Sequence, residues 1–201
     1  MARNHVAAAD PIVEGNSTWA LIRSDLDEAR VWWGSALTHI FPNVFVAISY
    51  RVAHHLEAAG WRPMAYAVSI LCQVLTGAEI RPGASIGPGF VVMHPSGIVI
   101  GPDVVAGRGL TMFGKNTLGR VRNPRDPLGG SPVIGDNVHI GTMASLLGPI
   151  RIGDGVQIGA HSLVVKDVPD GGRTRGSAAV VSGPRKETND GASAADRAGN
   201  P

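Results

Sequence analysis

The apolar residues of this chain follow two different rhythms, and the change between them occurs at Gly77. Before Gly77 they recur at the three- to four-residue spacing that places side chains on one face of a helix. The clearest series is Val44, Ile48, Val52 and Leu56. A hydroxyl of Ser17 or Thr18 can cap a first helix that runs toward Trp33. Pro42 suits the first turn of a second helix, which Gly60 ends, and a third helix over about 62–75 is stopped by Gly77. The sequence therefore predicts a helical region over residues 17–77.

After Gly77 the apolar residues recur every six positions, a period that fits neither a helix nor an alternating strand. Two series are Ile80, Ile86, Val92, Ile98, Val104, Leu110 and then Ile134, Ile140, Leu146, Ile152, Ile158, Val164. A triangular coil produces this period, because three short strands per turn each direct one aliphatic side chain inward, and about eighteen residues complete a circuit. We therefore expect a mainly β fold with a helical N-terminal part, the coil occupying residues 78–182.

Three segments lie outside both patterns. Residues 114–131 contain Lys115, several arginines, two prolines and Gly129-Gly130, a composition that predicts a loop leaving the coil. Residues 183–201 contain almost no large apolar residue, so we expect a disordered tail there. Residues 1–16 are expected to be a flexible N-terminus.

Composition narrows the classes of function. A formal net charge of +2 with 17% charged residues provides no extended basic surface, so nucleic acid is not an expected partner. The longest apolar run is far below the roughly 18 residues that span a bilayer, and no secretory leader pattern is recognisable. The single cysteine, Cys72, excludes an internal disulfide. We therefore expect a cytoplasmic protein with no membrane span.

Histidine is suited to proton transfer near neutral pH, and three histidines lie within the repeats: His94, His139 and His161. They occupy three phases of the six-residue period, which argues against a zinc site like that of the β-helical carbonic anhydrases, so no metal is expected. Glu79 precedes His94 by fifteen residues, which places the two on neighbouring coils at one corner. Such a pair is either a functional dyad, in which the carboxylate orients the imidazole, or a corner salt bridge without a catalytic role.

Several motifs resemble the serine acetyltransferase family. The start of that family's β-helix is similar to LTGAEIRPGASIGPG and MHPSGIVIG, and later coils are similar to PVIGDNVHIG, PIRIGDGVQIGA and VVKDVP. The family's N-terminal domain is similar to the helical segment containing YRVAHHLEAAG. This resemblance covers residues 17–182. It implies a left-handed parallel β-helix of hexapeptide repeats preceded by an α-helical domain, a handedness that the period alone does not determine.

The resemblance also implies a CoA-dependent O-acyltransferase. In this reading His94 is the general base, and Glu79 stands where the family has the aspartate paired with that base. His94 would take the proton of the acceptor hydroxyl as its oxygen attacks the thioester carbonyl of acetyl-CoA, while backbone amides stabilise the oxyanion. The imidazolium would then return the proton to the departing thiolate.

The acceptor side of the chain departs from the family pattern. Met93 stands where the family has an aspartate, and Gly130 and Ser131 stand where it has an Arg-His pair. Because those groups hold the amino-acid substrate by charge, the acceptor is expected to be a small hydroxylated molecule that need not be serine. A basic side chain of the predicted loop could replace the missing cation, or that loop could simply be solvated. Its arginines are Arg120, Arg122 and Arg125.

The resemblance further implies that acetyl-CoA lies in a groove between two neighbouring β-helices. The implied wall residues are Gly141, Thr142, Ala144, Gly159 and Ala160, with Lys166 near the nucleotide. A groove that needs two subunits, and a flat side that a lone β-helix exposes, predict a homotrimer or a dimer of trimers. The alternative is a catalytically silent β-helical scaffold, which would keep the repeats without needing His94 or a CoA groove.

Overall fold

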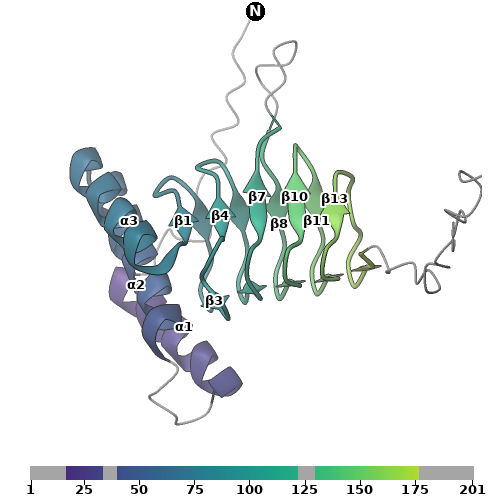
Figure 1. Ribbon diagram of the computed structural model, residues 1–201, viewed down its shortest axis with the longest axis horizontal. Helices are drawn as coiled ribbons and strands as arrows, with labels where there is room; N and C mark the ends of the chain where they lie inside the picture. Colours follow the sequence, from purple (N-terminus) through teal and green to yellow (C-terminus); the bar gives the residue numbers. More distant parts are fainter. Residues whose placement is uncertain (1–16, 34–39, 122–129, 177–201) are drawn as a thin grey trace, which may run out of the picture.

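The structure is a computed structural model that describes residues 17–33, 40–121 and 130–176. Three helices lie together at one end of a long coil of short strands (Figure 1). The expected N-terminal segment 1–16 and tail 183–201 lie outside the described residues, as do Arg122 and Arg125. No helix among the described residues is long and apolar enough to cross a membrane.

The helices are α1 (Thr18–Trp33), α2 (Ile40–Ala58) and α3 (Arg62–Thr76). The Ser17 hydroxyl accepts a hydrogen bond from the Ala20 amide at 3.2 Å, so Ser17 caps α1 as its sequence position predicts. Gly77 ends α3 with a left-handed φ of 76°, and its amide donates to the Gln73 carbonyl at 2.8 Å. Local capping chemistry was therefore sufficient to locate these ends.

The coil is a parallel β-helix whose strands form three sheets. The first sheet has the order β1-β4-β7-β10-β13, the second β11-β8-β5-β2, and the third β14-β12-β9-β6-β3. The strands are β1 (Glu79–Ile80), β2 (Ser85–Ile86), β3 (Val91–Val92), β4 (Val99–Ile100), β5 (Val105–Ala106), β6 (Thr111–Met112), β7 (Thr117–Gly119), β8 (Val133–Ile134), β9 (His139–Ile140), β10 (Ser145–Leu147), β11 (Arg151–Ile152), β12 (Gln157–Ile158), β13 (Leu163–Val164) and β14 (Arg173–Thr174).

The first circuit of the coil is longer than the predicted one. Glu79 pairs with Val99, a span of 20 positions, whereas Val99 pairs with Thr117, a span of 18. The two additional residues lie in the loop 93–98. In the next three strands, β4, β5 and β6, the six-residue series falls two positions ahead of the inward side chain. Both sets are buried: Ile98, Val104, Leu110 and Ile100, Ala106, Met112.

This change of phase corrects the predicted loop 114–131. The chain continues through β7, which pairs with β4 and β10, and Leu118 of β7 is fully buried. The predicted start at Gly114 is therefore wrong, and the excursion begins only after Gly119. The six-residue count missed β7 because the loop 93–98 had already moved the inward positions by two residues.

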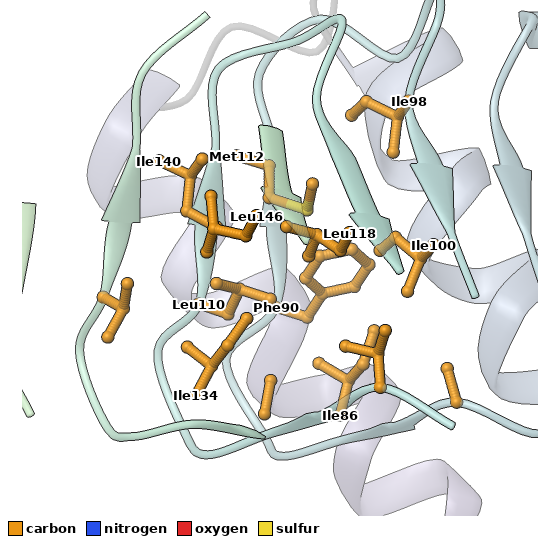
Figure 2. Packing of buried hydrophobic residues seen from close by; sticks show 14 of the residues in the cluster. Ile86, Phe90, Ile98, Ile100, Leu110, Met112, Leu118, Ile134, Ile140 and Leu146 are labelled. Carbon is orange, nitrogen blue, oxygen red and sulfur yellow. The ribbon is translucent and has the colours of Figure 1, made fainter. Parts of the chain in front are cut away.

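The interior of the coil is a continuous apolar column. Figure 2 shows the Phe90 ring surrounded by aliphatic side chains from several coils. Each buried aliphatic side chain contributes roughly 1.5–3 kcal/mol relative to an exposed one. This column runs from Ile80 in the first strand to Val164 in β13, so it is shared by successive coils.

A buried ion pair fastens the helices to the coil. The guanidinium of Arg51 in α2 donates to the carboxylate of Asp25 in α1 at 2.8 and 3.0 Å, and the Arg51 side chain is 0% exposed. Arg51 also donates to the carbonyls of Ile86 and Gly87, and the Phe90 amide donates to Asp25 at 2.9 Å. Burial raises the pKa of Asp25, while the Arg51 charge opposes that rise. α1 is thereby held against the third sheet.

Candidate active site

His94 lies in the loop 93–98, at the corner where the third sheet turns into the first. The register of the third sheet aligns Val92, Met112, Ile140 and Ile158. One position further along each coil are Met93, Phe113, Gly141 and Gly159; two positions further are His94, Gly114, Thr142 and Ala160. We call these two adjacent columns the corner lane. It joins the predicted base to four of the predicted donor-wall residues.

The backbone beneath His94 is held by a residue that the sequence analysis did not identify. Asn116 is fully buried; its Oδ1 accepts from the Gly114 amide at 3.0 Å and its Nδ2 donates to the Gly141 carbonyl at 2.7 Å. Gly114 packs so closely that a Cβ there would lie 2.7 Å from the His94 carbonyl oxygen and 2.9 Å from the His94 Cβ. A signal existed, because Asn116 follows Leu110 by six residues and is polar where the series predicts an aliphatic side chain.

The predicted dyad is not assembled in the structure. The His94 side chain is exposed, and within the described residues no hydrogen bond joins it to Glu79. The Glu79 carboxylate instead pairs with Arg81 Nη2 at 2.8 Å and accepts from Gln73 Nε2 at 3.4 Å. Glu79 is thus in a corner salt bridge, although its partner is Arg81. A dyad would require the carboxylate to exchange partners when substrate is bound.

The donor-wall residues differ in what they present to the lane. Thr142 donates its hydroxyl to the Gly114 carbonyl at 3.1 Å. A Cβ on Gly141 would lie 2.6 Å from the Ala160 amide nitrogen, so stacking of the coils requires glycine there whether or not a ligand binds. Ala144 is fully buried, so its side chain faces the core of the coil and does not reach the lane.

A groove of about 530 Å³ runs along the outer face of the third sheet beside the lane. Trp32, near the end of α1, forms one wall; its ring meets Phe113 edge-on with centroids 5.9 Å apart, and His139 with centroids 5.8 Å apart. The lining also includes Gly141, Gln157, Ile158, Gly159, Arg173, Thr174 and Arg175. Trp32 and both arginines were not identified from the sequence, although arginines alternating along a strand are a signal of a shared outer face.

The predicted acceptor residues lie elsewhere in the chain. Arg120, Gly130 and Ser131 follow β7 and precede β8, at the edge where the first sheet turns into the second. Arg120 pairs with Asp103. Ser131 is 8% exposed, and its hydroxyl has no hydrogen-bond partner among the described residues. Only Met93 lies beside His94, so one chain does not bring the predicted acceptor residues together.

Lys166 lies at that same distant edge, because it follows β13 in the first sheet. His139 faces the groove, and His161 lies three coils from His94. Over residues 17–33, 40–121 and 130–176, no three His, Cys, Asp or Glu side chains are grouped where they could hold a metal ion. The polar groups that the lane itself presents are the His94 imidazole, the Thr142 hydroxyl and backbone groups.

Known proteins are similar to this chain in sequence. Residues 131–166 match the family model described as bacterial transferase hexapeptide (six repeats). The serine acetyltransferase of Helicobacter pylori is 36% identical over 154 residues, which are 75% of this chain and 86% of that protein. The serine acetyltransferase of Mycobacterium tuberculosis is 37% identical over 159 residues, which are 74% of this chain and 66% of that protein.

Solved structures agree with the fold. Soybean serine acetyltransferase in complex with serine has a TM-score of 0.72 at 32% identity, covering 82% of this chain and 70% of that one. Entamoeba histolytica serine acetyltransferase 1 in complex with L-cysteine has a TM-score of 0.70 at 30% identity, covering 78% of this chain but 62% of that longer one. These similarities confirm the predicted fold class, a left-handed parallel β-helix that follows helices.

Proposed function

Because the chain belongs to the serine acetyltransferase family, we propose that it transfers an acetyl group from acetyl-CoA to the hydroxyl of a small acceptor. The observation that supports this most is the register that stacks Gly114, Thr142 and Ala160 beneath His94. An exposed imidazole stands at the head of that column, and a groove runs beside it. A silent scaffold would require neither feature.

In the proposed reaction His94 acts as the general base. The acceptor hydroxyl oxygen attacks the carbonyl carbon of the thioester while an imidazole nitrogen of His94 takes the hydroxyl proton. The carbon–sulfur bond then breaks, and the imidazolium gives its proton to the thiolate, so that an acetyl ester and free CoA leave. Glu79 would orient the imidazole and stabilise its charged form after leaving Arg81.

The acceptor is proposed to lack the charges of a free amino acid, or to be held differently from one. Met93 is half-buried beside His94 and has no charge with which to hold an ammonium group. Arg120 is already paired with Asp103, so it is not a free cation for a carboxylate. A hydroxylated sugar or another neutral metabolite needs no such charged partners, whereas the ammonium and carboxylate groups of serine do.

A homotrimer is proposed because the residues predicted to form the active site lie on two opposite edges of the first sheet. His94 is at one edge, and Gly130, Ser131 and Lys166 are at the other. Packing of β-helices side by side would bring one edge of a copy to the lane of its neighbour. The exposed apolar side chains of Val99, Leu163 and Val165 on and beside the first sheet would be covered by such packing.

Release of free thiol from acetyl-CoA in the presence of serine, sugars and aminoglycosides tests the proposal. We expect turnover with at least one acceptor, and its loss by at least about a hundredfold in His94→Ala, as is typical for removal of a general base. His55→Ala is the matched control, because His55 is an exposed imidazole on α2. CoA binding with no turnover on any acceptor, or full activity in His94→Ala, would contradict the proposal.

Glu79→Gln separates the dyad from the salt bridge. Its loss of turnover should be smaller than that of His94→Ala, because the amide can still accept a hydrogen bond from the imidazole but cannot stabilise its charge. Arg81→Gln breaks the same ion pair from the other side and is the control. Equal losses in Glu79→Gln and Arg81→Gln would indicate that the ion pair, and not a dyad, is what matters.

A further inference from the structure

The groove beside the corner lane ends at two arginines. Arg173 begins β14 and Arg175 follows it by two positions, so both side chains point to the same outer face, and both are exposed. Both line the groove. Among the described residues neither arginine makes an ion pair, and no carboxylate lines the groove. Two unneutralised guanidinium groups at the end of a groove favour an anionic ligand.

The backbone that carries these arginines is fixed by the neighbouring coil. The Gly159 amide donates to the Thr174 carbonyl at 3.1 Å, and the Gln157 amide donates to the Gly172 carbonyl at 3.0 Å. The Thr174 hydroxyl donates to the Ser162 hydroxyl at 3.1 Å. The two guanidinium groups therefore extend from a defined surface, which is what a bidentate contact with an anion requires.

Their position relative to His94 follows from the register. β12 pairs with β14 so that Ile158 aligns with Thr174, and Arg175 therefore continues the column of Met93, Phe113, Gly141 and Gly159. Four coil steps separate Met93 from Arg175, which at the spacing of paired strands is about 19 Å. The arginines therefore lie at the opposite end of the lane from the His94 imidazole, in a groove that Trp32 and Phe113 also line.

We propose that Arg173 and Arg175 bind the phosphate groups of the acyl donor, and that they make the enzyme select phosphorylated CoA thioesters over plain pantetheine thioesters. This inference rests on the proposed function, in which the thioester lies at His94. The extended pantetheine arm would then lie along the lane, and its phosphates would reach the arginines. Lys166, which the family resemblance places near the nucleotide, lies at the far edge of the first sheet and could join only from a second copy.

Calorimetric titration of CoA and of pantetheine into the full chain tests the assignment without depending on turnover. Arg173→Gln and Arg175→Gln should each weaken CoA binding about tenfold, as loss of a charge-assisted contact does, and leave pantetheine binding unchanged. With acetyl-CoA as donor, KM should rise by the same factor while kcat is retained. Arg151→Gln is the matched control, because Arg151 also begins a two-residue strand and is exposed, but on the second sheet.

If Arg173→Gln and Arg175→Gln bind CoA within about twofold of the Arg151→Gln control, the assignment is overturned. The proposed function would still stand if the unaltered enzyme turns over. Equal losses of affinity for CoA and for pantetheine would also overturn the assignment, because the substitutions would then have disturbed the structure of the coil and not a contact with phosphate. No CoA binding by the unaltered protein would overturn both proposals. Binding that depends on the arginines, without transfer to any acceptor, would support the phosphate site and reject only the proposed transfer.

Discussion

Replacing Asp25 by Asn should destabilise the protein strongly, because it leaves the buried Arg51 guanidinium without a counter-charge. Arg51 is 0% exposed, and two of its nitrogens donate to Asp25. Removing one partner of a buried ion pair costs about 3–5 kcal/mol. For a chain of this length each kcal/mol lowers Tm by about 2–4 °C, so we expect a decrease of about 6–20 °C.

Thermal unfolding followed by circular dichroism at one fixed protein concentration measures this effect, since the apparent stability of an oligomer depends on concentration. Asp27→Asn is the control. Asp27 lies on the same helix and pairs with Arg30 at 2.9 Å, but its side chain is 59% exposed. A surface pair of this kind contributes less than about 1 kcal/mol.

If Asp25→Asn melts within about 2 °C of Asp27→Asn, the buried pair does not hold α1 in the way we infer.

A second measurement addresses function, because α1 carries Trp32 to the groove. If loss of the buried pair loosens α1, Asp25→Asn should also weaken CoA binding, because Trp32 would no longer be held in the groove. The Asp27→Asn control should bind CoA as the unaltered protein does.

Two further predictions concern a glycine at the lane and the cysteine in α3. Gly114→Ala should lower turnover more than Gly155→Ala does, because the new Cβ would lie 2.7 Å from the His94 carbonyl oxygen and 2.9 Å from the His94 Cβ. Gly155 is the control because it is also at positive φ (64°) but has no atom within 4 Å of the added Cβ, and equal activities in the two variants would contradict the prediction. Cys72 is buried, and burial raises the pKa of its thiol, so less thiolate forms at a given pH. Alkylation by iodoacetamide at pH 8 should therefore be slow in the folded protein and fast in denaturant, and equal rates would contradict this.

The local parts of the architecture were readable from the sequence. Helix ends depend on contacts within a few residues, so Ser17 and Gly77 could be assigned from their capping chemistry. The inward side chains of a triangular coil recur along the chain itself, so the six-residue series predicted the coil without any knowledge of its neighbours. His94 stood out for the same reason, since its place in a motif is a property of sequence.

What the tertiary structure decided is which residues of different coils face one another. That depends on the number of residues at each corner, and the two additional residues of the loop 93–98 changed the pairing of Glu79 from the expected circuit of eighteen to one of 20. The same register set Asn116 beneath the lane and aligned Arg175 with Met93. Packing of α1 on the third sheet brought Trp32 to a groove formed by strands far away in sequence. A period predicts which side chains of each strand face inward, but the strand pairing of the folded coil determines how many residues each circuit contains and hence which residues lie side by side.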